Sequence, residues 1–196
     1  MRSAHVLALA LLCGACAPAP GVPSEADVRG SSARAASWAE PLARPGLPNL
    51  YRVSATLYRG AQPTREGFGE LARLGVKSVL SLRGFHDDDV PVEAGLAHER
   101  ISFKAWHAED EDVVRFLRFV ADPAHQPVFV HCQWGADRTG MMCAIERVAL
   151  EGWSKDDALA EMTQGGFGFH PEWQNLVQYV RELDVERLAR EAGLRH

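Results

Sequence analysis

The sequence predicts an α/β domain whose central sheet is mainly parallel and is flanked by helices on both faces. Two observations predict it. Short apolar runs of strand type alternate with amphipathic runs of helical spacing, and the 196 residues suit one domain with appendages. In such sheets the ligand binds outside the carboxyl ends of the strands, so the loops that follow strands are the first place to search for function.

The first 16 residues have the pattern of a secretory signal. Arg2 precedes an apolar run over residues 6–12, which is too short to span a bilayer, and small residues then lead to Cys16. This pattern resembles a bacterial lipobox, with cleavage before Cys16 and lipid on its sulfur, although Cys13 stands where Leu is usual. We therefore expect an exported protein, either a lipoprotein anchored in the membrane or, after cleavage near Ala17, a soluble periplasmic protein.

Two further segments are expected after the signal. Residues 17–45 are rich in Ala, Pro, Ser and Gly without periodicity, which predicts a flexible tether, and residues 46–196 are expected to form the folded domain. The net charge is −5 and Lys and Arg do not cluster, so no nucleic-acid partner is expected. The acidic run 87–89 could suggest a cation site, but an isolated acidic loop is normally just solvated.

The folded part begins with a short strand and a capped helix. Thr64 has a side chain suited to a helix N-cap, and Gly75 is a usual left-handed stop after a helix that ends at Leu74. The expected strands span residues 57–59, 76–82, 98–103 and 128–131. After the helix that ends at Leu74, helices are expected over residues 91–96 and 109–121. Another helix follows the loop after the strand over 128–131 and runs to about residue 150, and the last spans residues 173–189.

The segment after the strand over 128–131 carries groups suited to anion chemistry. Five residues separate Cys132 from Arg138, and a loop of this length before a helix can turn its backbone N–H groups inward as an anion nest. Arg138 can hold two phosphate oxygens through its planar guanidinium, and Gly135 allows a tight turn. Positive surroundings of this kind favour a thiolate, so Cys132 can act as a nucleophile, and Thr139 can hydrogen-bond its sulfur.

The string HCQWGADRTG, residues 131–140, resembles the signature loop of the protein tyrosine and dual-specificity phosphatases, which has His-Cys, five residues, Arg, then Ser or Thr. The Leu57–Pro63 stretch is similar to the start of a compact bacterial dual-specificity-like domain. The resemblance implies a metal-independent phosphatase without a cofactor, in which Cys132 forms a phosphocysteine and Arg138 clamps the phosphate. The loop residues implied to bind the substrate are Gln133, Trp134, Gly135, Ala136 and Thr139.

The proton donor for the leaving group is less evident. In most members of this family an Asp roughly thirty residues before the Cys acts as the general acid, but residues 100–106 contain no carboxylate. Asp137 is the stronger candidate, because it precedes Arg138 as in the Cys-x-x-Gly-x-Asp-Arg loops of myotubularin-like lipid phosphatases. The alternative interpretation of Asp137 is a structural salt bridge to a nearby Arg or Lys. Asp110 is the alternative acid, although an acid at a helix start usually caps it.

The loop does not decide the substrate class. Ala136 and Gln133 occupy positions where some lipid-directed relatives carry Lys, so a phosphorylated protein or a small aryl phosphomonoester is favoured over a phosphoinositide or an inositol polyphosphate. The competing interpretations are a rhodanese-like sulfurtransferase and a phosphate-binding module without activity. The Arg-Thr-Gly continuation argues against the first, and the pairing of Cys132 with Arg138 argues against the second. Cys143, among apolar residues of the next helix, is expected to belong to the core.

Overall fold

The computed structural model describes residues 37–194. The predicted signal over residues 1–16 and most of the predicted tether lie outside the described residues. The chain from Trp38 onward forms one unit, which contains all the strands and helices given below. None of the described helices is long and apolar enough to cross a membrane.

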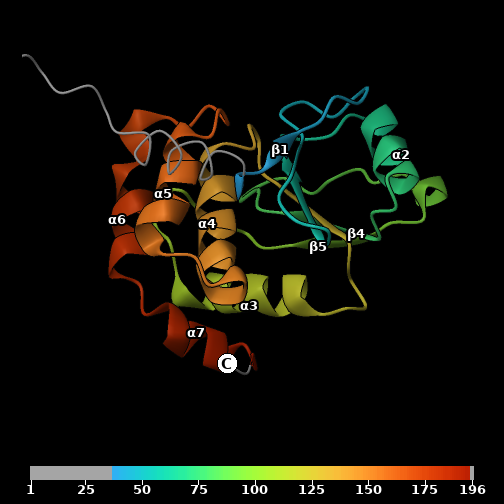
Figure 1. The fold of residues 1–196 in the computed structure, drawn as a ribbon. Helices are drawn as coiled ribbons and strands as arrows, with labels where there is room; N and C mark the ends of the chain where they lie inside the picture. Colours follow the sequence, from blue (N-terminus) through green and yellow to red (C-terminus); the bar gives the residue numbers. More distant parts are fainter. Residues whose placement is uncertain (1–36, 195–196) are drawn as a thin grey trace, which may run out of the picture. The chain divides into compact units, whose positions relative to one another are not determined.

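A mixed sheet lies at the centre of the described residues (Figure 1). Its strands are β1 (Glu40–Pro41), β2 (Tyr51–Arg52), β3 (Leu57–Gly60), β4 (Ser78–Ser81), β5 (Ala97–Arg100) and β6 (Val128–His131), in the spatial order β1-β2-β3-β6-β4-β5. The strands β3, β6, β4 and β5 run parallel, and β2 and β1 add an antiparallel edge. The predicted, mainly parallel sheet is confirmed, and the carboxyl ends of β3, β6 and β4 lie side by side.

Helices cover the two faces of this sheet unequally (Figure 1). One face carries α3 (Asp110–Ala121), α4 (Asp137–Glu151), α5 (Lys155–Gln164), α6 (Gln174–Glu182) and α7 (Val185–Glu191), and the other carries α2 (Arg65–Arg73) and the short 3₁₀ helix η1 (Val92–Ala94). Side chains alternate along β6, so that Val128 and Val130 pack in the larger core and Phe129 packs in the core beside α2. The loop that joins β6 to α4 is therefore anchored in the larger core at both ends.

The folded part begins earlier than the sequence predicts. Residues 38–45, assigned above to the tether over 17–45, belong to the fold, because β1 pairs with β2 and the buried Ala39 donates its N–H to Glu161 Oε1 (2.6 Å). A strand of two residues has no period that a sequence pattern can reveal, and its partners lie far along the chain. The domain boundary predicted at residue 46 is corrected to residue 38.

The helix predicted over 173–189 is two helices. Leu183 is extended, with ψ of 131°, and the side chain of Asp184 accepts a hydrogen bond from the Arg187 N–H (2.9 Å). Asp184 is thus an N-cap that starts α7, and a side chain able to cap a new helix competes with continuation of the old one.

Helix α5 is absent from the predicted elements. Its start has a clear signal, since Ser154 accepts a hydrogen bond from the Asp157 N–H (3.1 Å) as an N-cap. Its apolar stripe is interrupted by Glu161, which is buried and paired with the buried Arg147 of α4 (2.9 Å). Because the buried ion pair places a charged residue on the buried face of α5, the amphipathic pattern of this helix is not evident from the sequence.

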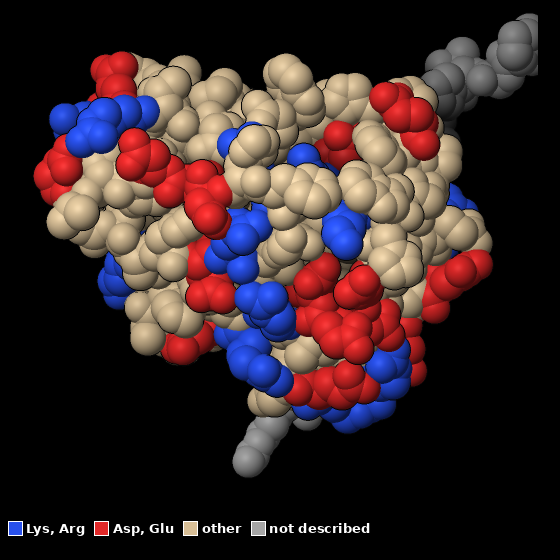
Figure 2. All heavy atoms as spheres, turned by 180° about the vertical axis from the view of Figure 1, so that it is seen from behind, with Lys and Arg blue, Asp and Glu red and all other residues tan. Residues whose placement is uncertain are grey.

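Charged side chains of both signs are mixed on the face of the molecule in Figure 2. Blue Lys and Arg side chains form a short run near the centre of this view, and red Asp and Glu side chains gather on both sides of it.

Candidate active site

The predicted nucleophile lies where β6 is followed by the loop to α4. Cys132 comes directly after the last residue of β6, and only 2 % of its surface is exposed. Arg138 lies in the first turn of α4, and its Nη1 donates to the carbonyl of Leu82 at the end of β4 (3.1 Å). The two residues therefore meet at the carboxyl ends of adjacent parallel strands, where this class of sheet binds its ligand.

The carbonyl groups of the loop are held from outside. Three successive carbonyls accept hydrogen bonds, Gln133 from the Gln62 N–H (3.3 Å), Trp134 from Asn49 Nδ2 (2.9 Å) and Gly135 from Arg59 Nη2 (2.8 Å). The N–H and C=O of one planar peptide point in opposite directions. Carbonyls bound on the outside therefore turn the neighbouring N–H groups inward, which forms the anion nest that the loop length predicts.

Gly135 is required by the close approach of β3 to the loop. Its φ is +69°, in the left-handed region, and a Cβ at this position would lie 2.3 Å from the carbonyl carbon and oxygen of Gly60. Any side chain at residue 135 would push the loop away from the end of β3. Glycine is therefore required at residue 135 for two reasons, the positive φ of the predicted turn and the close packing of the loop against Gly60.

Arg59 is the main support of the loop that sequence reasoning missed. This side chain is 1 % exposed, donates to the carbonyl of Gly135, and stacks over the ring of Phe167 at 3.6 Å. The signal in the sequence is a charged residue inside a short apolar strand, Leu57–Gly60. A buried Arg needs partners of this kind, so its position in a strand that ends at the site points to the site.

A pocket of about 300 Å³ opens above the loop. The loop contributes Gln133 and Arg138 to it. Basic and aromatic side chains of other segments line the rest, and they include Arg83, Phe85, His86, Phe103, Lys104, Trp106 and Trp173. The pocket therefore combines positive charge for a phosphate with flat apolar rings for the group that carries it.

The remaining predicted loop residues have different surroundings. Gln133 lines the pocket, Trp134 is largely exposed, and Ala136 is buried. The Thr139 hydroxyl is buried and has no hydrogen-bond partner among the described residues, so the predicted bond to the sulfur of Cys132 is not formed. Gln133 and Arg138 are thus the predicted substrate contacts that the structure brings to the pocket itself.

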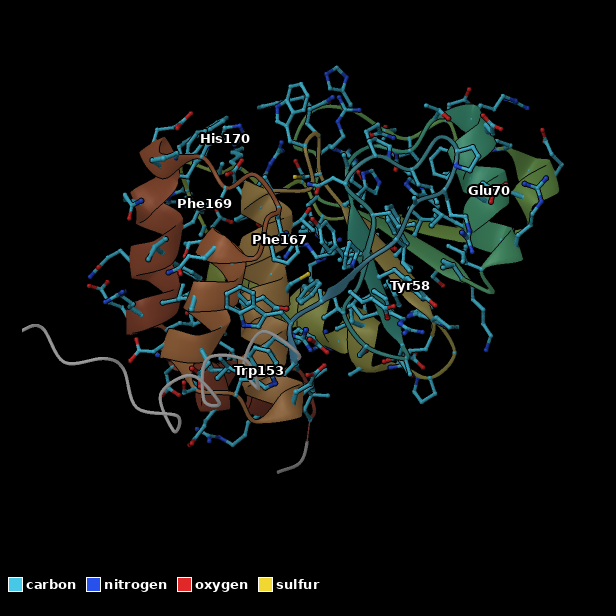
Figure 3. All side chains as sticks on the ribbon, turned by 45° about the horizontal axis from the view of Figure 1, so that its top comes forward. Tyr58, Glu70, Trp153, Phe167, Phe169 and His170 are labelled. Atoms are coloured by element: carbon cyan, nitrogen blue, oxygen red, sulfur yellow. The ribbon has the colours of Figure 1, made fainter. Side chains whose placement is uncertain are left out.

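Asp137 is bound to the loop that precedes α6. Its carboxylate accepts a hydrogen bond from the His170 N–H (2.9 Å) and pairs with His170 Nδ1 (2.9 Å). The hydrogen bond to Asp137 and its charge raise the pKa of His170. Figure 3 shows His170 on the same loop as Phe167 and Phe169. The carboxylate therefore joins two loops of the site, and its role as the general acid stays a prediction.

Asp110 is not brought to the loop. It lies in the first turn of α3, where it accepts a hydrogen bond from the Tyr179 hydroxyl (2.7 Å) and pairs with Arg187. The hydrogen bonds from Tyr179 and Arg187 lower its pKa, which keeps the carboxylate ionised at neutral pH. Its contacts join α3 to α6 and α7, and none of them involves the loop that begins at Cys132.

The segment that leads into α3 carries an acid beside a histidine. Residues 103–106 line the pocket, and Nε2 of the next residue, His107, lies 3.2 Å from Glu109 Oε1. Both side chains are exposed to solvent. The segment therefore presents a histidine and a carboxylate beyond the pocket wall, although residues 100–106 contain no acid.

These features define a class of enzyme. A cysteine at the end of a parallel strand, N–H groups turned into the following loop, and an arginine in the first turn of the next helix are the machinery of a cysteine-dependent phosphatase. Comparison with protein families agrees, since the model described as "DSP-PTPase phosphatase fused to NAD+ Kinase" matches residues 49–175. The chain belongs to this phosphatase family.

Known relatives extend the comparison. The dual specificity protein phosphatase TpbA of Pseudomonas aeruginosa (strain UCBPP-PA14) is 39% identical over 159 residues, which cover 79% of this chain and 71% of TpbA. A crystal structure of a cysteine-to-serine variant of P. aeruginosa TpbA in complex with pTyr matches with a TM-score of 0.71 and 35% identity, over 80% of this chain and 96% of that one. The inositol diphosphatase DSP5 of Arabidopsis thaliana is 25% identical over 151 residues, 72% of each protein.

The geometry accounts for the chemistry of a metal-independent cysteine phosphatase. The thiolate of Cys132 attacks the phosphorus in line, the bond to the leaving oxygen breaks, and that oxygen takes up a proton and departs as an alcohol or phenol, which leaves a phosphocysteine. Water then gives up a proton and attacks the phosphorus, the P–S bond breaks, and the thiolate and inorganic phosphate are released. Arg138 and the inward N–H groups hold the equatorial oxygens in both steps, so they stabilise the charge that develops in the transition states.

Proposed function

We propose that the enzyme removes phosphate from phosphotyrosyl residues of a protein or from small aryl phosphomonoesters. The observation that carries this proposal is a pair of exposed rings at the pocket. Phe85 and Trp106 expose 72 % and 62 % of their surface, and their rings are 19° from parallel with centroids 6.4 Å apart. Both line the pocket that contains Arg138, so a phosphate held there places its carrier beside the two rings.

Physical chemistry supports an aromatic carrier. Large apolar rings are seldom left in water without a role in binding, and aromatic pairs contribute about 0.5–1.5 kcal/mol beyond the area they bury. The relative TpbA, a dual specificity protein phosphatase, has a solved complex with pTyr. Arg83 and Lys104 line the same pocket and would attract the phosphate dianion.

The test compares two peptides of one sequence that carry either phosphotyrosine or phosphoserine. We expect kcat/KM to favour phosphotyrosine by about tenfold or more, and Phe85→Ala with Trp106→Ala to remove most of that preference. Val92→Ala is the matched control, because Val92 is 94 % exposed and does not line this pocket. Equal losses on both peptides would show that the rings do not recognise the aryl group.

Inositol phosphates are the second candidate substrates, and Lys104 is the observation that favours them. Lys104 lines the pocket together with Arg83 and Arg138, and three cationic residues suit a ligand with several phosphates. The relative DSP5 is an inositol diphosphatase. Under this alternative, Lys104→Ala lowers turnover of an inositol diphosphate about tenfold while turnover of p-nitrophenyl phosphate is kept.

We further propose that the enzyme is exported and held at a membrane by lipid on Cys16. The support is the sequence itself, an apolar run over residues 6–12 and small residues before Cys16. Labelling with a radioactive fatty acid should tag the full chain and fail with Cys16→Ala, and the untagged variant should leave the membrane fraction. A full chain that is never labelled, and is found outside the membrane, would favour simple cleavage.

A further inference from the structure

Three consecutive aspartates between β4 and η1 have different surroundings. The side chain of Asp87 is 78 % exposed and pairs with Arg100, and that of Asp89 is 98 % exposed. The side chain of Asp88 between them is 0 % exposed. The expectation that the acidic run 87–89 is simply solvated is therefore wrong for Asp88, and a buried carboxylate requires partners.

Two histidines contact Asp88, and a hydrogen bond with Gln62 adds to them. Asp88 Oδ2 lies 2.7 Å from Nε2 of His131 and 3.4 Å from Nε2 of His98. His131 is also fully buried and directly precedes Cys132. Burial alone would raise the pKa of Asp88, but the hydrogen bonds from His131 and His98 and the charge of His131 lower it well below its ordinary value. The buried acid is thus an ionised partner of the residue before the nucleophile.

The second ring nitrogen of His131 contacts the nucleophile loop. His131 Nδ1 lies 3.2 Å from the carbonyl oxygen of Cys132. A carbonyl oxygen can only accept a hydrogen bond, so this contact requires hydrogen on Nδ1. The ring of His131 therefore lies between Asp88 on one side and the backbone of Cys132 on the other.

This contact sets the direction of a peptide plane in the loop. The carbonyl of Cys132 and the N–H of Gln133 belong to one planar group and point in opposite directions. Because His131 holds the carbonyl on the sheet side, the Gln133 N–H is directed into the anion nest. The carbonyl of Gln133 is held in turn by the Gln62 N–H, so both ends of this residue are fixed.

We infer that Asp88 is a positioning residue of the phosphatase, which acts through His131 to direct the Gln133 N–H at the substrate phosphate. It has this role because it binds His131 Nε2 and keeps Nδ1–H on the Cys132 carbonyl. The same carboxylate ties the segment that carries Arg83 and Phe85 to the nucleophile loop. The inference rests on the cysteine chemistry of the family and not on the identity of the natural substrate.

The test compares Asp88→Ala, Asp88→Asn and Asp89→Ala in the full chain, with p-nitrophenyl phosphate as substrate and inorganic phosphate as competitive inhibitor. Asp88→Ala should lower kcat/KM by about 10- to 100-fold and raise the Ki of phosphate about tenfold, as loss of one charge-assisted hydrogen bond implies. Asp88→Asn should recover most of the loss, because its amide can donate to Nε2 and leave Nδ1–H on the carbonyl. Asp89→Ala should stay within twofold of the wild type.

Two results would overturn the inference. One is a folded Asp88→Ala variant whose kcat/KM and phosphate Ki match those of Asp89→Ala. The other needs no variant at residue 88. Nitrogen-15 NMR of the wild type, with His131 assigned by His131→Gln, should show hydrogen on Nδ1 at pH 7, and a bare Nδ1 would contradict the inference even if Asp88→Ala fails to fold.

Discussion

Cys132 and Cys143 are equally buried, yet their surroundings are opposite. Each exposes 2 % of its surface, and both are free thiols. Cys132 directly follows β6, at the start of the loop whose N–H groups point inward, and lies close in sequence to Arg138. Cys143 lies within α4 in the larger core, where burial raises its pKa to about 12 and the carboxylates of Glu146 and Glu161 add to the effect.

The comparison shows that burial does not decide whether a cysteine reacts. Around Cys132, the N-terminus of α4 and the loop N–H groups can hold an anion. At Cys143 the charges of Arg59 and Arg147 offset the effect of burial only in part, and the pKa is raised to about 12. Substitutions at the two cysteines and at the residues around Cys132 test this difference.

Replacing the nucleophile should abolish turnover. For Cys132→Ser we expect kcat on p-nitrophenyl phosphate to fall by roughly 10⁴-fold or more, because a serine hydroxyl is not ionised at neutral pH and no triad activates it here. Circular dichroism should show that the variant is folded, and retained binding of inorganic phosphate should show that the nest is intact. A variant within 100-fold of the wild type would place the nucleophile elsewhere.

Replacing Arg138 tests the contribution of positive charge and of the guanidinium geometry to the surroundings of Cys132. Arg138→Lys keeps one charge but loses the planar fork that can hold two phosphate oxygens, so kcat should fall by roughly 10²- to 10³-fold. Mass spectrometry of the Cys132 peptide after iodoacetamide treatment gives a second measurement, which is the extent to which Cys132 is alkylated in the variant and in the wild type. A kcat within threefold of the wild type would mean that charge alone, without the fork, stabilises the transition state.

Asp137 sharpens the comparison, because a carboxylate in the first turn of α4 opposes the positive surroundings of Cys132. Its contacts with His170 favour a role in holding the loop that precedes α6. We then expect Asp137→Asn and His170→Gln to lower kcat/KM by a similar factor of about ten on aryl and alkyl phosphates alike. A general acid gives a different result, since Asp137→Asn alone would then slow alkyl phosphates far more than aryl phosphates.

The stability of the Asp137–His170 pair gives an independent check. The pKa of His170 is raised in the folded state, so the contribution of the pair is fully present below the unfolded pKa of about 6.5 and is lost as pH rises through the folded pKa. The difference in Tm between wild type and His170→Gln should therefore shrink as pH increases from about 6 upward. A difference that is constant with pH would mean that the charge of His170 does not stabilise the fold.

The parts of the site that could be predicted are those that are local in the chain. Cys132, Gly135 and Arg138 lie within one loop, so their spacing alone encodes the anion nest and the clamp. The supports could not be predicted, because tertiary contacts bring them from far away. Asn49 reaches the carbonyl of Trp134 across 85 residues, and Asp88 reaches His131 across 43.

The fold shows the same division between local and distant signals. Buried parallel strands appear as short apolar runs and amphipathic helices have a period of their own, so both can be predicted from the sequence. The edge strand Glu40–Pro41 and the buried pair of Glu161 with Arg147 depend on partners elsewhere, and both were missed for that reason. Sequence patterns therefore indicate the reacting groups of this enzyme better than the groups that orient them.

The smallest effect is expected at the second cysteine. Cys143→Ala removes a buried sulfur from the larger core and should cost about 1 kcal/mol of stability, while kcat below the melting temperature should stay within twofold of the wild type. In the native wild type, iodoacetamide at pH 7 should modify Cys132 and leave Cys143 intact, and Cys143 should react only after unfolding. Modification of native Cys143 at a comparable rate would mean that its surroundings do not suppress the thiolate, and the contrast between the two cysteines would then rest on access to the substrate alone.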